Sequence, residues 1–119
     1  MKRRKKRMAL EFYRDEAGDP RARAVAGRDR EALAHFLESD VQGSAAFGLE
    51  ILAAIEAVAE GRLGEWTRTG NSHTLILSPE GAAIESEYDE DSGTGLVPLS
   101  DLGEAVTRWI EFLDGGVRH

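Results

Sequence analysis

The side chains best suited to chemistry are carboxylates gathered in the second half of the chain. Between Arg68 and Arg108 the sequence has no lysine or arginine, whereas eight acidic residues occur from Glu80 to Glu104. A surface that carries only negative charge attracts cationic groups over about 8 Å at physiological salt. The segment is therefore predicted to bind a basic protein partner through a short set of residues: Glu85, Glu87, Asp89, Glu90 and Asp91. An acidic surface that serves only solubility is the alternative.

A second charged segment, at the N-terminus, has the opposite sign. The 119 residues carry 15 basic and 22 acidic side chains, which gives a formal net charge of −7. The run at the N-terminus is entirely basic and consists of Lys2, Arg3, Arg4, Lys5, Lys6 and Arg7. A block of like charges repels itself, so residues 1–7 are predicted to form a disordered tail. In the alternative functional interpretation this tail binds nucleic acid or the ribosome, and Arg21 and Arg23 extend it.

The sequence shows no pattern typical of a catalytic or metal site. It has no cysteine, and His35, His73 and His119 lack the spacing of metal ligands. The segment 89–95 combines carboxylates with glycine but lacks the positions of an EF-hand loop, so cation binding there stays open. Glu85 and Glu87 would share one strand face, but no nucleophile lies beside them in the pattern. This favours a solvated surface over acid–base chemistry. The sequence therefore predicts a protein that is not an enzyme and that holds no cofactor or metal.

Length and hydropathy limit the class of molecule. A chain of 13.0 kDa that is 41% hydrophobic fits one globular domain, predicted over residues 8–119. No apolar run reaches the roughly 18 residues that a membrane span needs. The basic start is not followed by the apolar segment of a secretory signal. We therefore expect a cytoplasmic location and no contact with membranes.

The spacing of apolar residues predicts the elements that must hold these side chains. The expected elements are a strand over 8–14, a strand over 21–27, a helix over 29–41, a helix over 44–60, one bent strand or two strands over 66–78, a return strand over 82–88, a short strand over 96–99 and a helix that begins at Ser100. The order β-β-α-α-β-β-(β)-α predicts an α+β fold, an antiparallel sheet with about three helices packed on one face.

The same patterns assign side chains to the two faces of this sheet. The predicted core consists of Phe12, Leu33, Phe36, Leu37, Ile51, Ile55, Val58, Leu75, Leu77, Ile84, Leu102, Val106, Trp109 and Ile110. Both tryptophans, Trp66 included, are expected in the core or at its rim. The other face is expected to carry Thr74, Ile76, Glu85 and Glu87. Ile76 is the apolar exception in that polar set, which indicates contact with a partner or a homodimer through this face.

Several short motifs, taken in order, resemble the YacL family of small uncharacterised bacterial proteins. They are Leu10-Glu11-Phe12-Tyr13-Arg14-Asp15, His35-Phe36-Leu37, Trp66-x-Arg68-x-Gly70, His73-Thr74-Leu75 and Tyr88-Asp89-Glu90-Asp91-Ser92. The resemblance covers about residues 8–114. The sequence departs from the family at His73, where a tyrosine is expected, and over 93–97. The resemblance implies a fold and no particular activity.

The overall build also resembles small immunity proteins that neutralise bacterial nuclease toxins, since those are acidic, poor in cysteine, not enzymes and of similar length. A nuclease has a cationic cleft for phosphates, and an acidic surface steers towards such a cleft and accelerates association. The sequence therefore favours an acidic protein-binding module without catalytic activity, with a nuclease-type toxin as one class of partner. Binding of nucleic acid or the ribosome through the basic N-terminal tail is the alternative.

Overall fold

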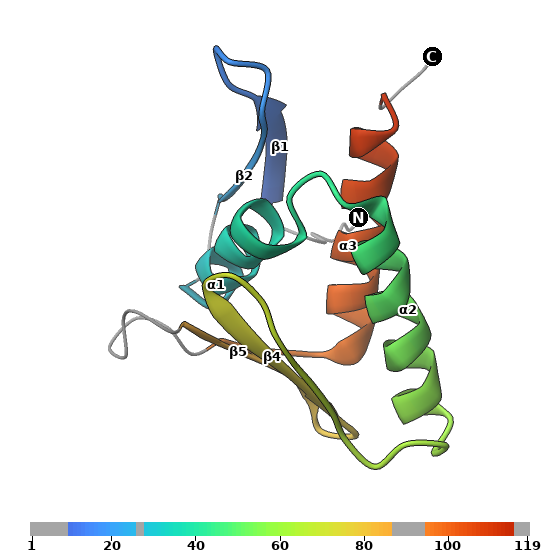
Figure 1. Cartoon of the computed structure of the whole chain (residues 1–119). Helices are drawn as coiled ribbons and strands as arrows, with labels where there is room; N and C mark the ends of the chain where they lie inside the picture. The colour runs from blue at the N-terminus through green and yellow to red at the C-terminus, as the bar shows by residue number, and fades with distance from the viewer. Residues whose placement is uncertain (1–9, 26–27, 87–94, 116–119) are drawn as a thin grey trace, which may run out of the picture.

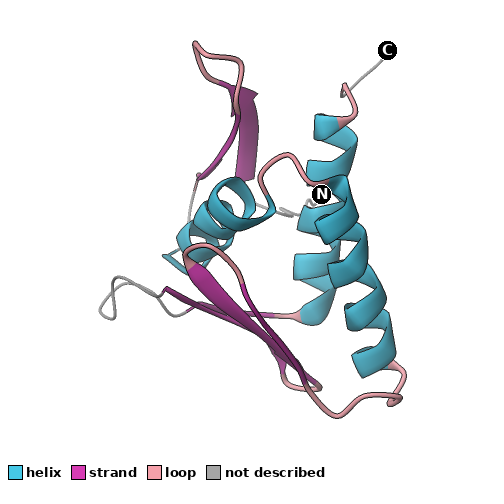
Figure 2. Cartoon of the chain, in the orientation of Figure 1, coloured by secondary structure: helices cyan, strands magenta, loops and turns pink. Residues whose placement is uncertain are grey.

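The computed structural model describes residues 10–25, 28–86 and 95–115, which form two antiparallel sheets and a set of helices (Figures 1 and 2). In chain order the elements are β1 (Leu10–Arg14), β2 (Pro20–Ala24), α1 (Arg28–Phe36), the π-helix η1 (Leu37–Val41), α2 (Ala45–Ala59), β3 (Trp66–Thr69), β4 (His73–Ser78), β5 (Gly81–Ser86), β6 (Gly95–Val97) and α3 (Leu99–Leu113). The predicted α+β fold and element order are confirmed, and residues 66–78 form two strands.

Four strands form the main sheet in the order β3-β4-β5-β6, each antiparallel to the next. Pro79 and Glu80 make the tight connection between β4 and β5. Gly81 follows with a φ of 142°, and a Cβ at this position would lie 2.8 Å from the carbonyl oxygen of Val97. Glycine is therefore required here for both its backbone conformation and the close approach of β6.

The helices α1, α2 and α3 lie on one side of the main sheet, and the core is between them (Figure 1). Side chains of β4 alternate accordingly, with His73, Leu75 and Leu77 buried and the residues between them only half-buried. The predicted core residues that are fully buried are Leu33, Phe36, Leu37, Ile51, Val58, Leu75, Leu77, Ile84, Leu102, Val106 and Trp109. Four other predicted residues, namely Phe12, Ile55, Trp66 and Ile110, are partly buried and pack against this core.

Helices α2 and α3 pack closely against each other. A Cβ at Gly48 of α2 would lie 2.8 Å from Cδ1 of Ile110 in α3, so a larger residue would require the Ile110 side chain to move. Helix α3 begins at Leu99 with Pro98 at its N-cap, two residues before Ser100, which the sequence predicted as the cap. Within the described ranges, no helix combines the length and hydropathy needed to cross a lipid bilayer.

Strands β1 and β2 form a two-stranded sheet of their own, which we call the N-terminal hairpin. This corrects the prediction that Phe12 belongs to the same sheet as Leu75, Leu77 and Ile84. Helix α1 contacts both β2 and the main sheet, and the hairpin stands on the opposite side of α1 from β4 and β5 (Figure 1). The alternation of Leu10 and Phe12 identified the strand correctly, but alternation alone does not specify which sheet a strand joins.

The predicted helix over 29–41 changes its hydrogen bonding before it ends. Helix α1 stops at Phe36, and η1 follows as a π-helical turn closed by the Gln42 amide, which donates to the Leu37 carbonyl at 2.7 Å. Gln42 has a φ of 53°, in the left-handed region that residues other than glycine rarely adopt. The Trp109 indole N–H donates to the Gln42 carbonyl at 2.8 Å and helps to hold this conformation. π-Helical turns are frequent at functional sites.

Candidate functional site

Of the five acidic residues predicted to bind a partner, Glu85 lies in the described part of the chain. The remaining four, Glu87, Asp89, Glu90 and Asp91, lie outside the described residues. Glu85 is exposed on β5 and pairs across the ladder with Thr74 of β4. Because both residues alternate with buried ones, Glu85 lies on the face of the main sheet that the helices leave open, as predicted.

A row of apolar side chains crosses this open face, which we call the uncovered face. The strand registers place Ile76 beside Ala83 and Ala83 beside Leu96. Leu96 is 59% exposed, whereas Ile76 and Ala83 are half-buried. The neighbouring row contains Thr74 and Glu85, so the apolar side chains have a polar and acidic border. An apolar centre with a polar rim is the usual composition of a protein–protein interface.

Arginine side chains of the described part are engaged within the molecule. Each arginine whose side chain is described contacts a carboxylate or a carbonyl: Arg14 with Gly18, Arg21 with Asp15 and Glu38, Arg23 with Glu11, Arg62 with Glu60, Arg68 with Glu50 and Arg108 with Glu104. By contrast, several exposed carboxylates form no ion pair among the described residues, namely Glu16, Glu31, Glu56, Glu65, Glu85 and Glu111. The charge that the described surface offers to other molecules is therefore mainly negative.

The two hairpin arginines of the alternative interpretation, Arg21 and Arg23, are among these engaged side chains. Arg21 Nε lies 3.8 Å from Asp15 and 3.7 Å from Glu38, and Arg23 pairs with Glu11 at 2.7 Å. The hydrogen bond from Arg23 to the Glu11 carboxylate, together with its charge, raises the pKa of Arg23. Lys2, Arg3, Arg4, Lys5, Lys6 and Arg7 lie outside the described residues.

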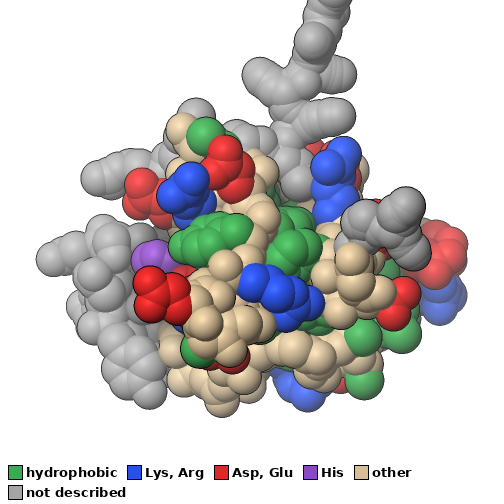
Figure 3. Space-filling view, turned by 90° about the horizontal axis from the view of Figure 1, so that it is seen from above, with side chains coloured by type: hydrophobic (Ala, Val, Ile, Leu, Met, Phe, Trp, Pro, Cys, Tyr) green, Lys and Arg blue, Asp and Glu red, His purple; other side chains and the backbone are tan. Residues whose placement is uncertain are grey.

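The end of the molecule that carries the hairpin shows both signs of charge. Seen from above, acidic and basic side chains of the described residues stand around a group of hydrophobic ones (Figure 3). Exposed ion pairs of this kind contribute little to stability. The described part of this end therefore differs from the continuous basic surface that usually binds nucleic acid.

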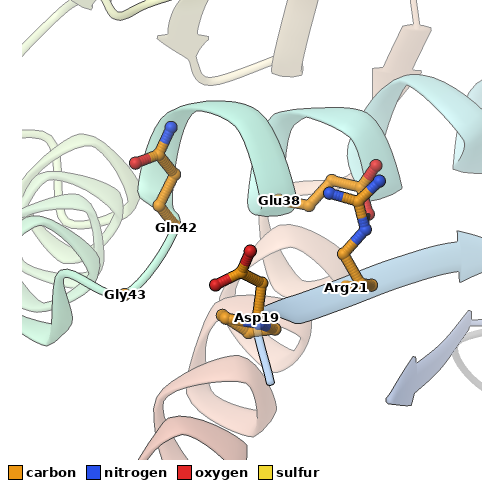
Figure 4. A pocket seen from close by; sticks show the side chains of 6 residues that line it. Asp19, Arg21, Glu38, Gln42 and Gly43 are labelled. Carbon is orange, nitrogen blue, oxygen red and sulfur yellow. Dashed lines mark ion pairs between the residues drawn. The ribbon is translucent and has the colours of Figure 1, made fainter. Parts of the chain in front are cut away.

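A cavity of about 430 Å³ lies between the start of β2 and the end of η1 (Figure 4). It is lined by Asp19, Pro20, Arg21, Glu38, Gln42 and Gly43. Glu38 is fixed because one of its carboxylate oxygens accepts a hydrogen bond from the Ala22 amide at 2.9 Å. The cavity thus joins the hairpin to the π-helical turn and presents charged groups of both signs.

A buried acid–histidine pair was missed by the sequence analysis. Asp40 and His73 are 8% and 5% exposed, and Oδ1 of Asp40 lies 2.8 Å from Nδ1 of His73. Oδ2 of Asp40 accepts hydrogen bonds from the amides of Ser72 and His73 at 3.0 and 3.1 Å. Gly70 leaves the space for this carboxylate. Buried polar groups require such partners, so the pair fastens η1 to the start of β4.

One signal for this pair was present in the sequence. His73 precedes Leu75 and Leu77 at alternate positions, which places it on the buried face of the strand. A buried histidine needs a polar partner, but the partner comes from a distant π-helical turn that no local pattern reveals. Among the described residues, no group of three or more histidines and carboxylates could hold a metal ion.

Comparison with known proteins relates the chain to one family. The model of an uncharacterised protein family, UPF0231, matches residues 8–96. The chain is 35% identical to a UPF0231 protein of Cronobacter sakazakii, in an alignment that covers 89% of this chain and 97% of the relative. It is 34% identical to a UPF0231 protein of Klebsiella pneumoniae, which covers 89% of this chain and 98% of the relative. The YacL proteins that the sequence motifs resemble are the same family.

A third relative, the UPF0231 protein of Pectobacterium atrosepticum, is 29% identical over 89% of this chain and 98% of its own length. The names of these relatives state no activity. No solved structure matches the chain at a significant level.

Proposed function

We propose that this protein, which belongs to the UPF0231 family, is a protein-binding module without catalytic activity that uses its acidic surface on a basic partner. The binding surface is the uncovered face of the main sheet, where Ile76, Ala83 and Leu96 form the apolar centre and Glu85 lies at the border. Apolar contacts supply most of the affinity of such interfaces, and charges at the rim mainly select the partner and accelerate encounter.

The observation that carries the proposal is the unequal engagement of charges. Arginines with described side chains are each held by a carboxylate or carbonyl of the same chain, whereas Glu85 and other exposed carboxylates of the described part have no ion pair. A cation that approaches therefore meets unneutralised negative charge, while an anion meets few available arginines. This arrangement supports a basic partner more than an acidic one.

The chemistry of the surface suggests a class of partner. A nuclease-type toxin binds phosphates in a cationic cleft, and a protein that blocks this cleft must present carboxylates beside an apolar contact area. An immunity protein for such a toxin is the finer form of our proposal. It predicts association that is fast at low salt and slows as salt screens the two surfaces.

Charge reversal on the uncovered face tests the proposal. The parent protein, immobilised and exposed to native bacterial lysate, should retain a basic protein that high salt releases. Glu85→Lys should abolish retention of that protein, and Leu96→Asp should do so as well. Glu56→Lys, which reverses an exposed unpaired carboxylate on α2, is the matched control and should retain it. Equal retention by the parent and both face variants would refute the uncovered face as the binding surface.

Binding of nucleic acid or the ribosome through residues 1–7 is a second candidate, favoured by the six consecutive basic residues alone. Six phosphate contacts would give a logarithmic salt dependence with a slope of about −5. Deletion of residues 1–7 separates the two candidates, because it should abolish nucleic-acid binding and leave capture of the basic protein unchanged. Loss of protein capture on deletion would favour the tail.

A second copy of the chain is another occupant that the uncovered face could take. Ile76→Glu places a charge in the apolar row, so a homodimer formed through this face should dissociate. Sedimentation of the parent and of Ile76→Glu measures this directly. If both sediment as monomers, association through this face is excluded and a different protein is left as the occupant.

A further inference from the structure

The cavity between β2 and η1 is separate from the uncovered face, and the proposed function does not use it. Its volume of about 430 Å³ falls in the range of small-molecule sites. Two elements far apart in the sequence build it, because Asp19 and Arg21 come from the hairpin whereas Glu38 and Gln42 come from η1 and the residue that closes it (Figure 4). Pockets between two structural elements are common ligand-binding sites.

The cavity lining offers hydrogen-bond acceptors. The Asp19 carboxylate forms no hydrogen bond or ion pair within the described part of the chain. Gln42 donates its amide nitrogen to the Ser39 carbonyl at 2.6 Å, which leaves the amide oxygen as an acceptor. Glu38 uses one carboxylate oxygen for the Ala22 amide and keeps the other. An ammonium group has three N–H donors and matches such a set of oxygens.

The cavity also offers hydrogen-bond donors, next to the Glu38 carboxylate. Asp15 and Glu38 hold Arg21 through its Nε atom, at 3.8 and 3.7 Å. Its two terminal nitrogens make no hydrogen bond to any residue that the structure describes. A guanidinium held in this way is ready to pair end-on with a carboxylate through two parallel hydrogen bonds.

We infer that this cavity binds a small zwitterion that carries an ammonium and a carboxylate, the class to which free α-amino acids belong. A ligand with only positive charge would face the Arg21 guanidinium, and a ligand with only negative charge would face Asp19 and Glu38. A zwitterion can pair its carboxylate with the guanidinium and its ammonium with the carboxylates. Asp19 and Arg21 are two residues apart, about 7 Å along an extended chain, so their side chains can reach one compact ligand from the same side.

Nuclear magnetic resonance can measure this binding, through shifts of the backbone amide signals of the full-length protein. The probes are the twenty protein amino acids, supplied singly, together with the amide form and the N-acetyl form of each. We expect at least one amino acid to shift the amide signals of Ala22 and Gly43 at millimolar concentration. Its amide form lacks the carboxylate and its N-acetyl form lacks the ammonium, so each should bind at least about tenfold more weakly.

Two variants assign the two ends of the ligand. Asp19→Asn should weaken binding of the amino acid and of its amide form by about tenfold, with no effect on the N-acetyl form. Arg21→Gln should weaken the amino acid and the N-acetyl form, with no effect on the amide form. Glu16→Gln, in the same hairpin turn but outside the cavity lining, is the control and should bind as the parent does. Both altered side chains are at the surface, and unchanged thermal unfolding confirms that the variants fold.

Three results would overturn the inference: no amino acid shifts these amides, the modified forms bind as tightly as the parent amino acids, or Asp19→Asn and Arg21→Gln bind normally. Glu85→Lys, on the uncovered face, should bind the amino acid unchanged. The inference and the proposed function therefore fail or succeed independently.

Discussion

The N-terminal hairpin and the main sheet are both antiparallel, yet they are held to the molecule by different forces. In β4 the inward residues His73, Leu75 and Leu77 are all buried, and helices cover them. In the hairpin, Ala22 is the one residue of β1 and β2 that is fully buried. The main sheet thus depends on apolar burial, whereas the hairpin depends on a few contacts at its border.

These contacts of the hairpin are aromatic and polar. Phe12 packs edge-on against Trp109, with ring centroids 5.0 Å apart, and lies 5.8 Å from Phe112. On the other strand, the Ala22 amide donates to Glu38 of η1. Elements with few buried apolar contacts open at lower free energy than the core. The difference therefore predicts a hairpin that opens locally while the main sheet stays folded. The cavity lies between this hairpin and η1.

The largest effect is expected where the main sheet is most buried. Leu75 is 0% exposed, so Leu75→Ala should lower the free energy of unfolding by about 2–5 kcal/mol, through lost burial and a residual cavity. Ile76→Ala, on the half-buried uncovered face of the same strand, is the control and should cost clearly less. Urea denaturation measures both. Equal losses would mean that the uncovered face is buried in solution, as it would be in a homodimer.

The next effect concerns the polar contact that fastens η1 to the main sheet. Asp40→Ala removes the acceptor of three hydrogen bonds and leaves the buried His73 without its partner, so it should cost about 3 kcal/mol. Gly70→Ala should also destabilise, because a Cβ there would collide with this carboxylate. In the double variant the collision is absent. The loss of unfolding free energy in the double variant should therefore be smaller than the sum of the losses in the two single variants. Additive losses in urea denaturation would contradict this contact.

Local sequence patterns predicted the structural features that depend on residues close together in the sequence. The alternation that sets Leu75, Leu77 and Ile84 on one face predicted the two strands β4 and β5 and their buried face correctly. The spacing of Leu102, Val106 and Trp109 likewise gave the buried stripe of α3. In each case one segment contains both the pattern and its structural consequence.

Contacts between distant segments were not predictable in the same way. Nothing near Phe12 indicates that it packs on Trp109 rather than in the main sheet. The π-helical turn that brings Asp40 to His73 depends on one extra residue in a helix, which leaves the apolar spacing almost unchanged. The cavity also escaped prediction, because its lining joins residues near 20 with residues near 40. The role of Glu85 and of the other predicted site residues in binding a partner stays a prediction.

A smaller effect is expected at the aromatic contact of the hairpin. Phe12 is only partly buried, so Phe12→Ala should lower the free energy of local opening by about 1–2 kcal/mol, less than for a fully buried ring. The loss should appear in native-state hydrogen exchange as faster exchange of β1 and β2 amides, while amides of β4 and β5 keep their rates. Tyr13→Ala, at an exposed position of the same strand, is the control. Equal acceleration in both sheets would show that hairpin and main sheet unfold together.

The smallest effect is expected at the exposed ion pair on the hairpin, between Arg23 and Glu11. Both side chains are well exposed, so solvent and salt screen their attraction, and Arg23→Gln should leave the urea midpoint unchanged. The hydrogen bond to Glu11 raises the pKa of Arg23, so any contribution of this pair is fully present below the ordinary arginine pKa and is lost only as the pH rises through the raised pKa. The parent and Arg23→Gln should accordingly show the same stability difference from pH 5 to pH 9, where arginine stays charged. A difference that grows with falling salt would show that this pair, rather than Phe12, holds the hairpin in place.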